Sequence, residues 1–321
     1  MGNKDLTKFS GLNETVVIPE GVKRILPSSL TKLRYARELI LPSTLEYFTP
    51  YAILDLDTEK GFYPFVKKVH IENNDRYTSV IGVLYSKDMK SLIYMPPLEK
   101  NEAFEIPDGI EEIAEAACAL ITGYNLFWSH SGKEITFPKS LRKISKNSFY
   151  GVKIKSIEIP SNITLSEGSF EECNIDCRLN IGNEIIPERC FINRVKNVRL
   201  YDTVKEVKKH AFSGELKKIY ISPNTKLDEE FLSPLYTIIN NYDDNGKLIE
   251  QVKKKLSINT IIGGKINSYA HKYAEMNNIK FQEVENNDAD IEAFLYDDKD
   301  TVLSFSMENE PFVSDNDDLM F

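Results

Sequence analysis

Four cysteines and four histidines are the side chains of this 321-residue chain that could bind a metal ion. Cys173 and Cys177 are four residues apart and Cys190 lies further on, but no fourth ligand stands at a spacing that zinc sites use. The remaining candidates are scattered along the chain: Cys118, His70, His130, His210 and His271. The sequence therefore predicts cysteines that act as small buried apolar residues, with no metal site and no cofactor.

No sequence motif of nucleophilic or phosphate chemistry is complete. Gly263-Gly264-Lys265 contains part of a phosphate-binding loop, but Ile266 follows where that loop needs serine or threonine. The carboxylate pairs Glu111-Glu112 and Glu171-Glu172 fall at positions where solvent-facing charges are ordinary. We expect a protein that is not an enzyme.

Positive charge is concentrated in the middle of the chain. Residues 133–220 hold 17 lysines and arginines against 11 acidic residues, a net charge of +6, while residues 1–132 have a net charge of −4. Cations along a groove with stacking aromatic residues are what sequence-tolerant binding of single-stranded nucleic acid requires. The candidate nucleic-acid-binding residues are Lys139, Arg142, Lys143, Lys146, Tyr150, Lys153, Lys155, Arg194, Lys196, Arg199, Tyr201, Lys205, Lys208, Lys209, Lys217 and Lys218. The alternative is that these charges form an ordinary solvated face.

The end of the chain has a different composition. Residues 285–321 contain 12 acidic residues and one lysine, a net charge of −11, with short apolar islands such as Phe294-Leu295-Tyr296. High charge with little apolar continuity favours disorder over docking through these islands. We therefore predict a folded domain at residues 1–284 and a disordered acidic tail at residues 285–321. A corollary is that the tail folds back on the basic region and is displaced by nucleic acid.

The last residues of the tail form a distinct pattern. Three acidic residues precede an apolar end, in the order Asp315, Asp317, Asp318, Leu319, Met320, Phe321. This pattern resembles the C-terminal tip of bacterial single-stranded DNA-binding proteins, although Met320 stands where that family usually has proline. The resemblance implies a tip that recruits replication or repair proteins, with the phenylalanine ring in an apolar pocket and its carboxylate against a basic side chain. The alternative is a solubilising tail that happens to end in apolar residues.

Most of the chain consists of a repeat. Apolar residues recur at offsets 0, +2, +6, +9 and +14, as in Val16, Ile18, Val22, Ile25 and Leu30. The same template fits four further segments, which begin at Leu39, Phe104, Ile135 and Val198. Equivalent strand residues between Phe137 and Ile221 are 19 to 22 residues apart, at or close to the length of leucine-rich repeats.

The first two apolar offsets have a period of two, which places both side chains on one face of a short strand. A proline follows this pair or its equivalent at Pro19, Pro42, Pro107, Pro138 and Pro160. Proline has no N–H for a strand ladder, so it turns the chain out of the strand. The other three offsets point back into the same core, which only stacked repeats can close. The expected fold is a leucine-rich-repeat solenoid, strand-rich with short helical or irregular return segments and α/β by convention.

Two segments depart from the repeat. Between Ile71 and Ile106, two apolar strands flank Lys87-Asp88, which predicts an inserted hairpin at residues 80–97. Residues 258–284 form a predicted C-terminal cap, whose helix at residues 266–277 covers the open end of the stack. The apolar positions of that helix are Ile266, Tyr269, Tyr273, Ala274 and Met276.

Two segments of the repeat carry a family resemblance that extends over residues 12–284. They are Ser156-Ile-Glu-Ile-Pro160 continuing to Ser169-Phe170-Glu-Glu-Cys173, and Val204-Lys-Glu-Val207 continuing to His210-Ala-Phe212-Ser-Gly214. Both are similar to the BspA-type leucine-rich repeats of bacteria. Many members of that family are secreted or attached to a surface, so the resemblance implies a solenoid with a binding role.

Two hypotheses of function follow. The first is a non-catalytic binding protein that holds single-stranded DNA on its basic surface and recruits a protein partner through its Phe-terminated tail. The second is a protein-binding scaffold or adhesin-like module with no nucleic-acid role. Residues 1–12 lack the apolar stretch of a signal peptide, and no window reaches about 18 consecutive apolar residues. We therefore expect a cytoplasmic protein with no membrane contact.

Overall fold

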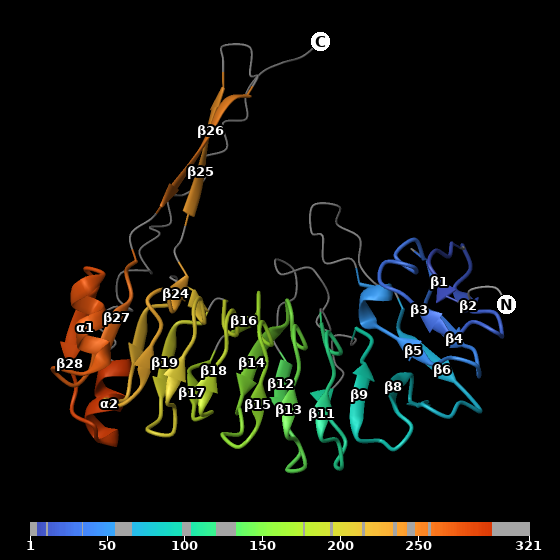
Figure 1. Ribbon diagram of the computed structural model, residues 1–321, viewed down its shortest axis with the longest axis horizontal. Coiled ribbons are helices and arrows are strands. Elements are labelled where there is room, and N and C mark those ends of the chain that lie inside the picture. The colour runs from blue at the N-terminus through green and yellow to red at the C-terminus, as the bar shows by residue number, and fades with distance from the viewer. Residues whose placement is uncertain are drawn as a thin grey trace, which may run out of the picture.

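The computed structural model describes residues 5–10, 12–33, 35–54, 66–97, 104–119, 133–175, 177–192, 195–213, 216–233, 236–242, 248–255 and 258–296. Figure 1 shows an elongated stack of coils, with the N-terminal coils at one end and two helices at the other. The predicted leucine-rich-repeat solenoid is confirmed, because strands of successive coils pair in parallel along the stack.

Three sheets that follow one another along the solenoid contain the first strands of the coils. Sheet B contains β2 (Thr15–Val17), β4 (Glu38–Leu41) and β6 (Lys68–Ile71). Sheet D contains β10 (Phe104–Glu105), β12 (Lys133–Thr136), β14 (Lys153–Ile157) and β16 (Asn174–Ile175). Sheet E contains β17 (Leu179–Ile181), β19 (Asn197–Leu200), β22 (Lys218–Tyr220), β27 (Ile261–Gly264) and β28 (Lys280–Glu283).

A separate set of sheets contains the second strands of the coils together with inserted and additional strands. Sheet A contains β1 (Asp5–Leu6), β3 (Arg24–Ile25) and β5 (Tyr47–Phe48), and the 3₁₀ helix η1 (Pro50–Ala52) follows β5. Sheet C contains β7 (Tyr77–Val80), β8 (Val83–Ser86), β9 (Ser91–Tyr94), β11 (Glu112–Ile113), β13 (Lys143–Ile144) and β15 (Thr164–Leu165). Sheet F contains β18 (Ile185–Ile186), β20 (Glu206–Val207) and β23 (Lys226–Leu227), and β21 (Phe212–Ser213) pairs with β24 (Leu232–Ser233).

The prolines act where the sequence places them, just after the first strand of a coil. The carbonyl of Pro138 accepts a hydrogen bond from the N–H of Leu141 at 3.0 Å, and Pro42 and Leu45 repeat the arrangement at 3.2 Å. This is the i to i+3 bond of a β-turn, which directs the chain from the first strand into the second. Proline thus ends one strand and begins the turn that positions the next.

The +14 position and its equivalents in the shorter coils form the spine of the C-terminal half. The rings of Phe149, Phe170, Phe191 and Phe212 stack in sequence, with centroid distances of 5.1, 5.4 and 5.5 Å. All four are fully buried. The residues two positions earlier, Asn147, Gly168, Arg189 and His210, all have φ between 53° and 64°. One left-handed residue per coil therefore turns the chain so that each phenylalanine lands on its neighbour.

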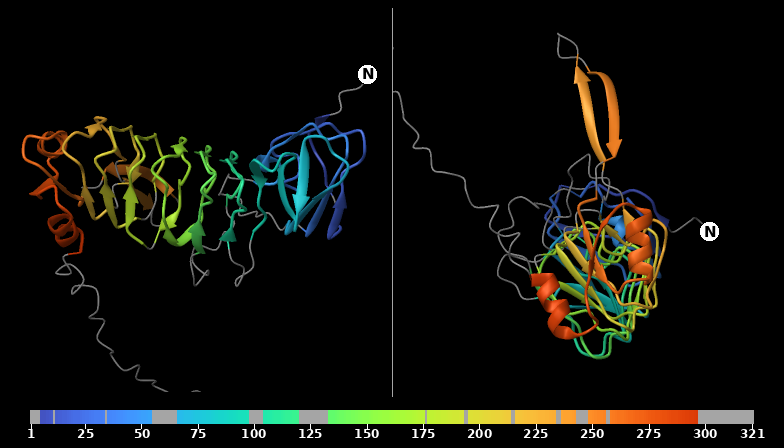
Figure 2. Two further views of the ribbon diagram at one scale, coloured as in Figure 1. Left: turned by 90° about the horizontal axis from the view of Figure 1, so that it is seen from below. Right: turned by 90° about the vertical axis from the view of Figure 1, so that its left-hand side faces the viewer.

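Two insertions leave the stack. The hairpin predicted at residues 80–97 corresponds to β8 and β9, and β7 adds a third antiparallel strand before them. A second hairpin, which sequence reasoning missed, pairs β25 (Tyr236–Tyr242) with β26 (Leu248–Lys255) and projects from the solenoid (Figures 1 and 2). Its signals in the sequence were the 43-residue step between Ile219 and Ile262, which pair in register, and the dipeptide Asn245-Gly246, which is common in hairpin turns.

The helix α1 (Tyr269–Met276) packs at the C-terminal end of the stack. Ser268 begins it as N-cap, because its side chain accepts a hydrogen bond from the N–H of His271. Ala270, Tyr273 and Ala274 are buried, whereas Ile266, Tyr269 and Met276 are exposed. The predicted apolar face is therefore only partly right, because the helix starts three residues later than expected and presents a narrower side to the core.

The predicted boundary of the disordered tail is wrong for residues 288–296, which form the helix α2 (Asp288–Tyr296). Ile291, Phe294 and Leu295 are buried. Figure 2 shows α1 and α2 on opposite sides of the solenoid end. The apolar islands decide the outcome here, because Ile291, Phe294 and Leu295 fall on one face of a helix and find an apolar patch on the sheet. The tip residues Asp315, Asp317, Asp318, Leu319, Met320 and Phe321 lie outside the described residues.

Candidate partner-binding surfaces

The structure does not bring the predicted nucleic-acid-binding residues together in one groove. Lys153, Lys155, Arg199 and Lys218 lie in the first-strand sheets, Lys143 lies in sheet C, and Lys205 and Lys208 flank β20 of sheet F. Lys146 and Lys209 lie in the turns that follow the second strands, and Lys139 and Arg142 lie in the turn between β12 and β13. Lys196 and Lys217 immediately precede β19 and β22, and Arg194 lies outside the described residues.

Several of these cations are paired with acids of neighbouring coils. The Nζ atoms of Lys143, Lys155 and Lys205 lie 2.9, 2.7 and 2.5 Å from carboxylate oxygens of Glu112, Glu134 and Glu184. Lys146 pairs in the same way with Glu167, and Lys209 with Glu230. Exposed pairs add little stability, about 0–1 kcal/mol each. They do cancel positive charge locally, because residues one repeat apart are stacked.

The aromatic candidates are placed differently from one another. Tyr150 is half-buried and packs against the small cluster of Leu54, Ala116 and Ala119. Tyr201 is 40% exposed, and the guanidinium of Arg199 lies 4.7 Å from its ring centroid. A row of open stacking platforms is therefore not formed by these two residues.

Arg199 and Lys218 contact the helix α2. Arg199 pairs with Asp288 and lies 3.5 Å from Glu292, and Arg178 lies 2.5 Å from Glu292. Lys218 is buried and its Nζ donates to the main-chain carbonyl of Phe294 at 2.9 Å. The start of the acidic segment thus lies on part of the basic region.

The local sequence explains why α2 forms. Asn287 precedes it, and its Oδ1 accepts a hydrogen bond from the N–H of Asp290 at 3.0 Å. Asp288 and Asp290 in the first turn also suit the positive end of the helix dipole. Asn287 followed by apolar residues at 291, 294 and 295 was the sequence signal for this helix.

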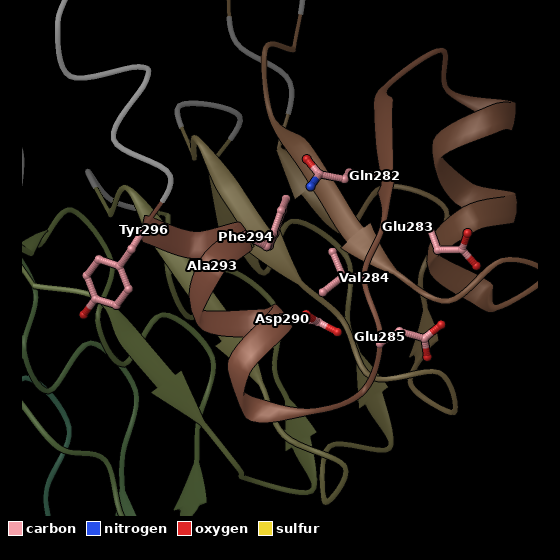
Figure 3. A pocket seen from close by; sticks show the side chains of 8 residues that line it. All are labelled: Gln282, Glu283, Val284, Glu285, Asp290, Ala293, Phe294 and Tyr296. Carbon is pink, nitrogen blue, oxygen red and sulfur yellow. The ribbon is translucent and has the colours of Figure 1, made fainter.

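A groove of about 710 Å³ runs between α2 and β28 (Figure 3). Val284 and Phe294 lie beneath it, while Glu283, Glu285 and Asp290 surround it with carboxylates. The flank of α2 that does not face Arg178 and Arg199 is therefore acidic.

A second surface lies on the outer face of sheet B, at the other end of the solenoid. Val17 of β2 pairs in register with Ile40 of β4, and their side chains are 58% and 37% exposed. The turn between β7 and β8 lies beside the next strand, since the N–H of Val69 donates to the carbonyl of Gly82 at 2.8 Å. Val80 and Ile81 of this turn are also exposed. We call Val17, Ile40, Val80 and Ile81 the N-terminal strip.

Ile81 is the least expected residue of the N-terminal strip. Its φ is 50° and that of Gly82 is 81°, which are the signs of a type I′ turn, where asparagine or aspartate is the usual first residue. A left-handed conformation costs an L-residue about 1–2 kcal/mol, and β-branching increases the strain. Ile81 is nevertheless 95% exposed, so the strained side chain buries nothing within the molecule.

The sequence contained a signal for part of this surface. Val17 and Ile40 occupy offset +1 between two inward positions, where alternation places a side chain in solvent. An apolar residue at offset +1 in two successive coils is therefore a mark of an exposed apolar patch.

Three of the four cysteines have the buried character that the sequence predicts, whereas Cys177 is half-buried. Cys118, Cys173 and Cys190 are fully buried, and burial raises the pKa of the Cys190 thiol to about 12. Burial raises the pKa of the Cys118 and Cys173 thiols as well. Within the described ranges, no group of three or more histidine, cysteine, aspartate or glutamate residues is arranged to hold a metal ion. No described helix has the length and apolar character needed to cross a membrane.

Comparisons with known proteins agree with this geometry. Residues 121–235 match the model of the BspA type leucine rich repeat region in six copies. The solved structure of the pneumococcal vaccine antigen PcpA is similar, with a TM-score of 0.50 and 15% identity over 85% of this chain and 68% of that chain. A leucine-rich repeat protein from Eubacterium ventriosum has a TM-score of 0.49 and 16% identity over 66% of this chain and 55% of that chain. No match was found among curated proteins.

The fold and the matched repeats define a leucine-rich-repeat solenoid protein. Its middle part is similar to BspA-type repeats, as the sequence resemblance implied. At 15% identity, the likeness to the pneumococcal antigen shows the fold and nothing about what this chain binds.

Proposed function

We propose that this protein is a non-catalytic scaffold that binds a protein partner through the N-terminal strip. The observation that carries the proposal is the strained and exposed Ile81. It stands beside β6, in the sheet whose preceding strands β2 and β4 expose Val17 and Ile40. Strain without internal compensation is a mark of a functional position. Such a residue is stabilised when a partner supplies the apolar pocket that the chain itself lacks.

The surroundings of the strip support an apolar contact. Glu38 of β4 and Lys68 of β6 pair in register two positions before Ile40, lie 3.8 Å apart and balance each other's charge. Tyr35 and Leu12 are exposed at equivalent positions before β4 and β2. The buried centre of a protein interface is typically depleted of charge and rich in apolar and aromatic side chains.

The test is site-specific photocrosslinking in the cells that produce the protein. A benzophenone amino acid at position 40 is expected to capture one dominant protein, and the same probe at Lys155 on sheet D is the matched control. Substituting Ile81→Asp in the position-40 bait should reduce this product at least about tenfold, since central anchors contribute 2 kcal/mol or more. Equal capture from both positions, or capture that ignores Ile81→Asp, would contradict the proposal. A product that is a second copy of the chain identifies a homo-oligomer contact.

The single-stranded DNA hypothesis and the recruiting role of the C-terminal tip stay predictions. The geometry favours the protein-binding scaffold, because the candidate cations lie on several sides and many are ion-paired. Fluorescence anisotropy of a labelled single-stranded oligonucleotide at low salt decides between them. We expect no saturable binding by the full chain. Salt-sensitive binding that is lost on Lys139→Gln and Arg142→Gln substitution would restore the nucleic-acid hypothesis.

A further inference from the structure

The outer face of sheet E holds cations whose counter-ions come from outside the repeats. Arg178 and Arg199 have side chains only 18% and 12% exposed, and in the described part of the chain their carboxylate partners are Asp288 and Glu292. Both acids belong to α2. Lys143, Lys155 and Lys205 differ, because each pairs with a glutamate of a neighbouring coil. The solenoid therefore leaves two arginines on this face for an added acidic segment.

The same face recognises the end of a helix. Asn197 Nδ2 donates to the carbonyl of Leu295 at 3.0 Å, and Lys218 Nζ donates to that of Phe294 at 2.9 Å. The last four carbonyls of a helix have no partner within the helix, and cations suit that end of the dipole. Asn197 and Lys218 are paired in register on β19 and β22, so the sheet presents both donors side by side.

Apolar contacts complete the site. Ile291, Phe294 and Leu295 pack with Tyr220 and Val284 in a cluster separate from the main core. Phe294 lies over Gly263, where an added Cβ would stand 2.6 Å from the ring. Glycine at this position of β27 therefore leaves the space that an aromatic side chain of the helix fills.

The occupant of this site has little stability of its own. A nine-residue helix is marginal in water, because isolated helices shorter than about 12–15 residues rarely persist. Asp288 is 85% exposed even when docked, and the segment between β28 and α2 consists of only four residues, 284–287. Elements held by a small separate cluster open at lower free energy than the core strands beneath them.

We propose that the outer face of sheet E is a receptor for short acidic amphipathic helices, with α2 as its occupant within the chain. The partner that it fits is a protein segment with carboxylates at positions i and i+4 and an aromatic-leucine pair in its last turn. Such a segment competes with α2 for Arg178, Arg199 and Lys218. The surface is distinct from the N-terminal strip, and the proposal stands whether or not that strip binds a partner.

Hydrogen exchange of the full chain tests whether α2 is displaceable. The amides of residues 291–296 are expected to exchange at least about tenfold faster than those of β22, by local opening. Equal protection of α2 and β22 would mean that α2 leaves only when the solenoid unfolds, and would overturn the proposal.

A labelled peptide with the sequence of residues 286–297 tests the receptor. Full-length Phe294→Ala/Leu295→Ala protein, whose own α2 is weakened, should bind it about tenfold or more tightly than wild type, since the wild-type face is already occupied. Ala289→Ser, on the exposed side of α2, is the matched control and should behave as wild type. Adding the Arg178→Gln and Arg199→Gln substitutions to this variant should abolish binding of the peptide. A peptide with lysine in place of Asp288 and Glu292 should also fail to bind.

The remaining outcomes count against the receptor. Equal binding by wild type and the Phe294→Ala/Leu295→Ala variant, or no binding by that variant up to about 1 mM peptide, would show that the face does not accept a helix in trans. Binding that survives loss of both arginines would show non-specific association. Unfolding of the whole solenoid by Phe294→Ala/Leu295→Ala would show that α2 is an integral part of the fold.

Discussion

The outer faces of sheet B and sheet E are built from equivalent positions of the repeat, yet one is exposed to solvent and the other is covered by a helix. Sheet B leaves Val17 and Ile40 in solvent, with no element of the described chain over them. Sheet E buries Tyr220 and Lys218 beneath α2 and pairs its arginines with acids of that helix. The repeat thus provides a surface of fixed geometry whose outward residues decide whether it stays open for a partner or is covered.

The interiors of the two ends differ as well. Stacked phenylalanine rings fill the +14 position or its equivalent from Phe149 to Phe212, whereas Leu30 and Ile53 fill it near the N-terminus. Aromatic stacking adds about 0.5–1.5 kcal/mol per pair beyond area burial. The interior of the C-terminal coils that carry α2 therefore gains an additional stabilising contribution from ring stacking.

Removal of one ring from this stack is the change with the largest expected effect. Phe170→Ala should lower the free energy of unfolding by about 3–5 kcal/mol, because it leaves a cavity between two rings. Leu30→Ala at the equivalent aliphatic position should cost less, toward the lower end of about 2–5 kcal/mol. Urea denaturation of both variants provides the measurement. A larger loss from Leu30→Ala would show that the aromatic stack does not add stability to the C-terminal half.

Charge reversal under α2 is expected to act locally and strongly. Arg199→Glu places a third carboxylate beside Asp288 and Glu292, and the helix should detach because a partly buried cation has been replaced by a like charge. Limited proteolysis should then cleave within residues 288–296. Lys205→Glu, which disrupts an exposed pair with Glu184, is the control and should leave α2 protected. Cleavage of both variants at the same rate would show that Arg199 under α2 contributes no more to holding the helix than the exposed Lys205.

Relief of strain at Ile81 should produce a smaller effect of opposite sign. Ile81→Asn is expected to raise the free energy of unfolding by about 1 kcal/mol, because asparagine tolerates positive φ better than a β-branched residue. Thermal denaturation measures this gain, and the crosslinking yield at position 40 should fall in the same variant. A gain in stability with an unchanged crosslinking yield would show that the strain at Ile81 is unrelated to partner binding.

The number of thiols that react with maleimide reports local opening of the fold, and it is expected to change least of all. At pH 8, Cys118, Cys173 and Cys190 should stay protonated and unreactive, since burial raises the pKa of each thiol. Half-buried Cys177 should account for the single equivalent that reacts with maleimide in the native protein. Detachment of α2 in the Arg199→Glu variant should leave the number of reactive thiols at one, because the other three thiols lie in the main core inside the coils. Three or four reactive thiols would indicate that the coils open together with the helix.

The apolar offsets and the prolines were sufficient to predict the solenoid. Val16, Leu39 and Ile135 point inward as alternation requires, and the turns after the first strands begin at the prolines. The segment around Phe294 was the main error, because acidic composition outweighed a short helical pattern with its Asn287 cap. The candidate cations within the described residues are spread over several sheets and turns, since charge counted along the chain does not show which coil face or which glutamate each lysine meets.

The sequence by itself determined the inward half of this protein. Stacked coils share one core, so every inward position is constrained by its neighbours and leaves a period that can be read directly. The outward half was decided by the tertiary structure. Arg178, Arg199 and Lys218 meet α2 across 76 to 114 residues of chain, and Ile81 comes to lie beside β6 through an insertion. Outward positions carry no packing constraint, so only the folded chain shows which of them act together.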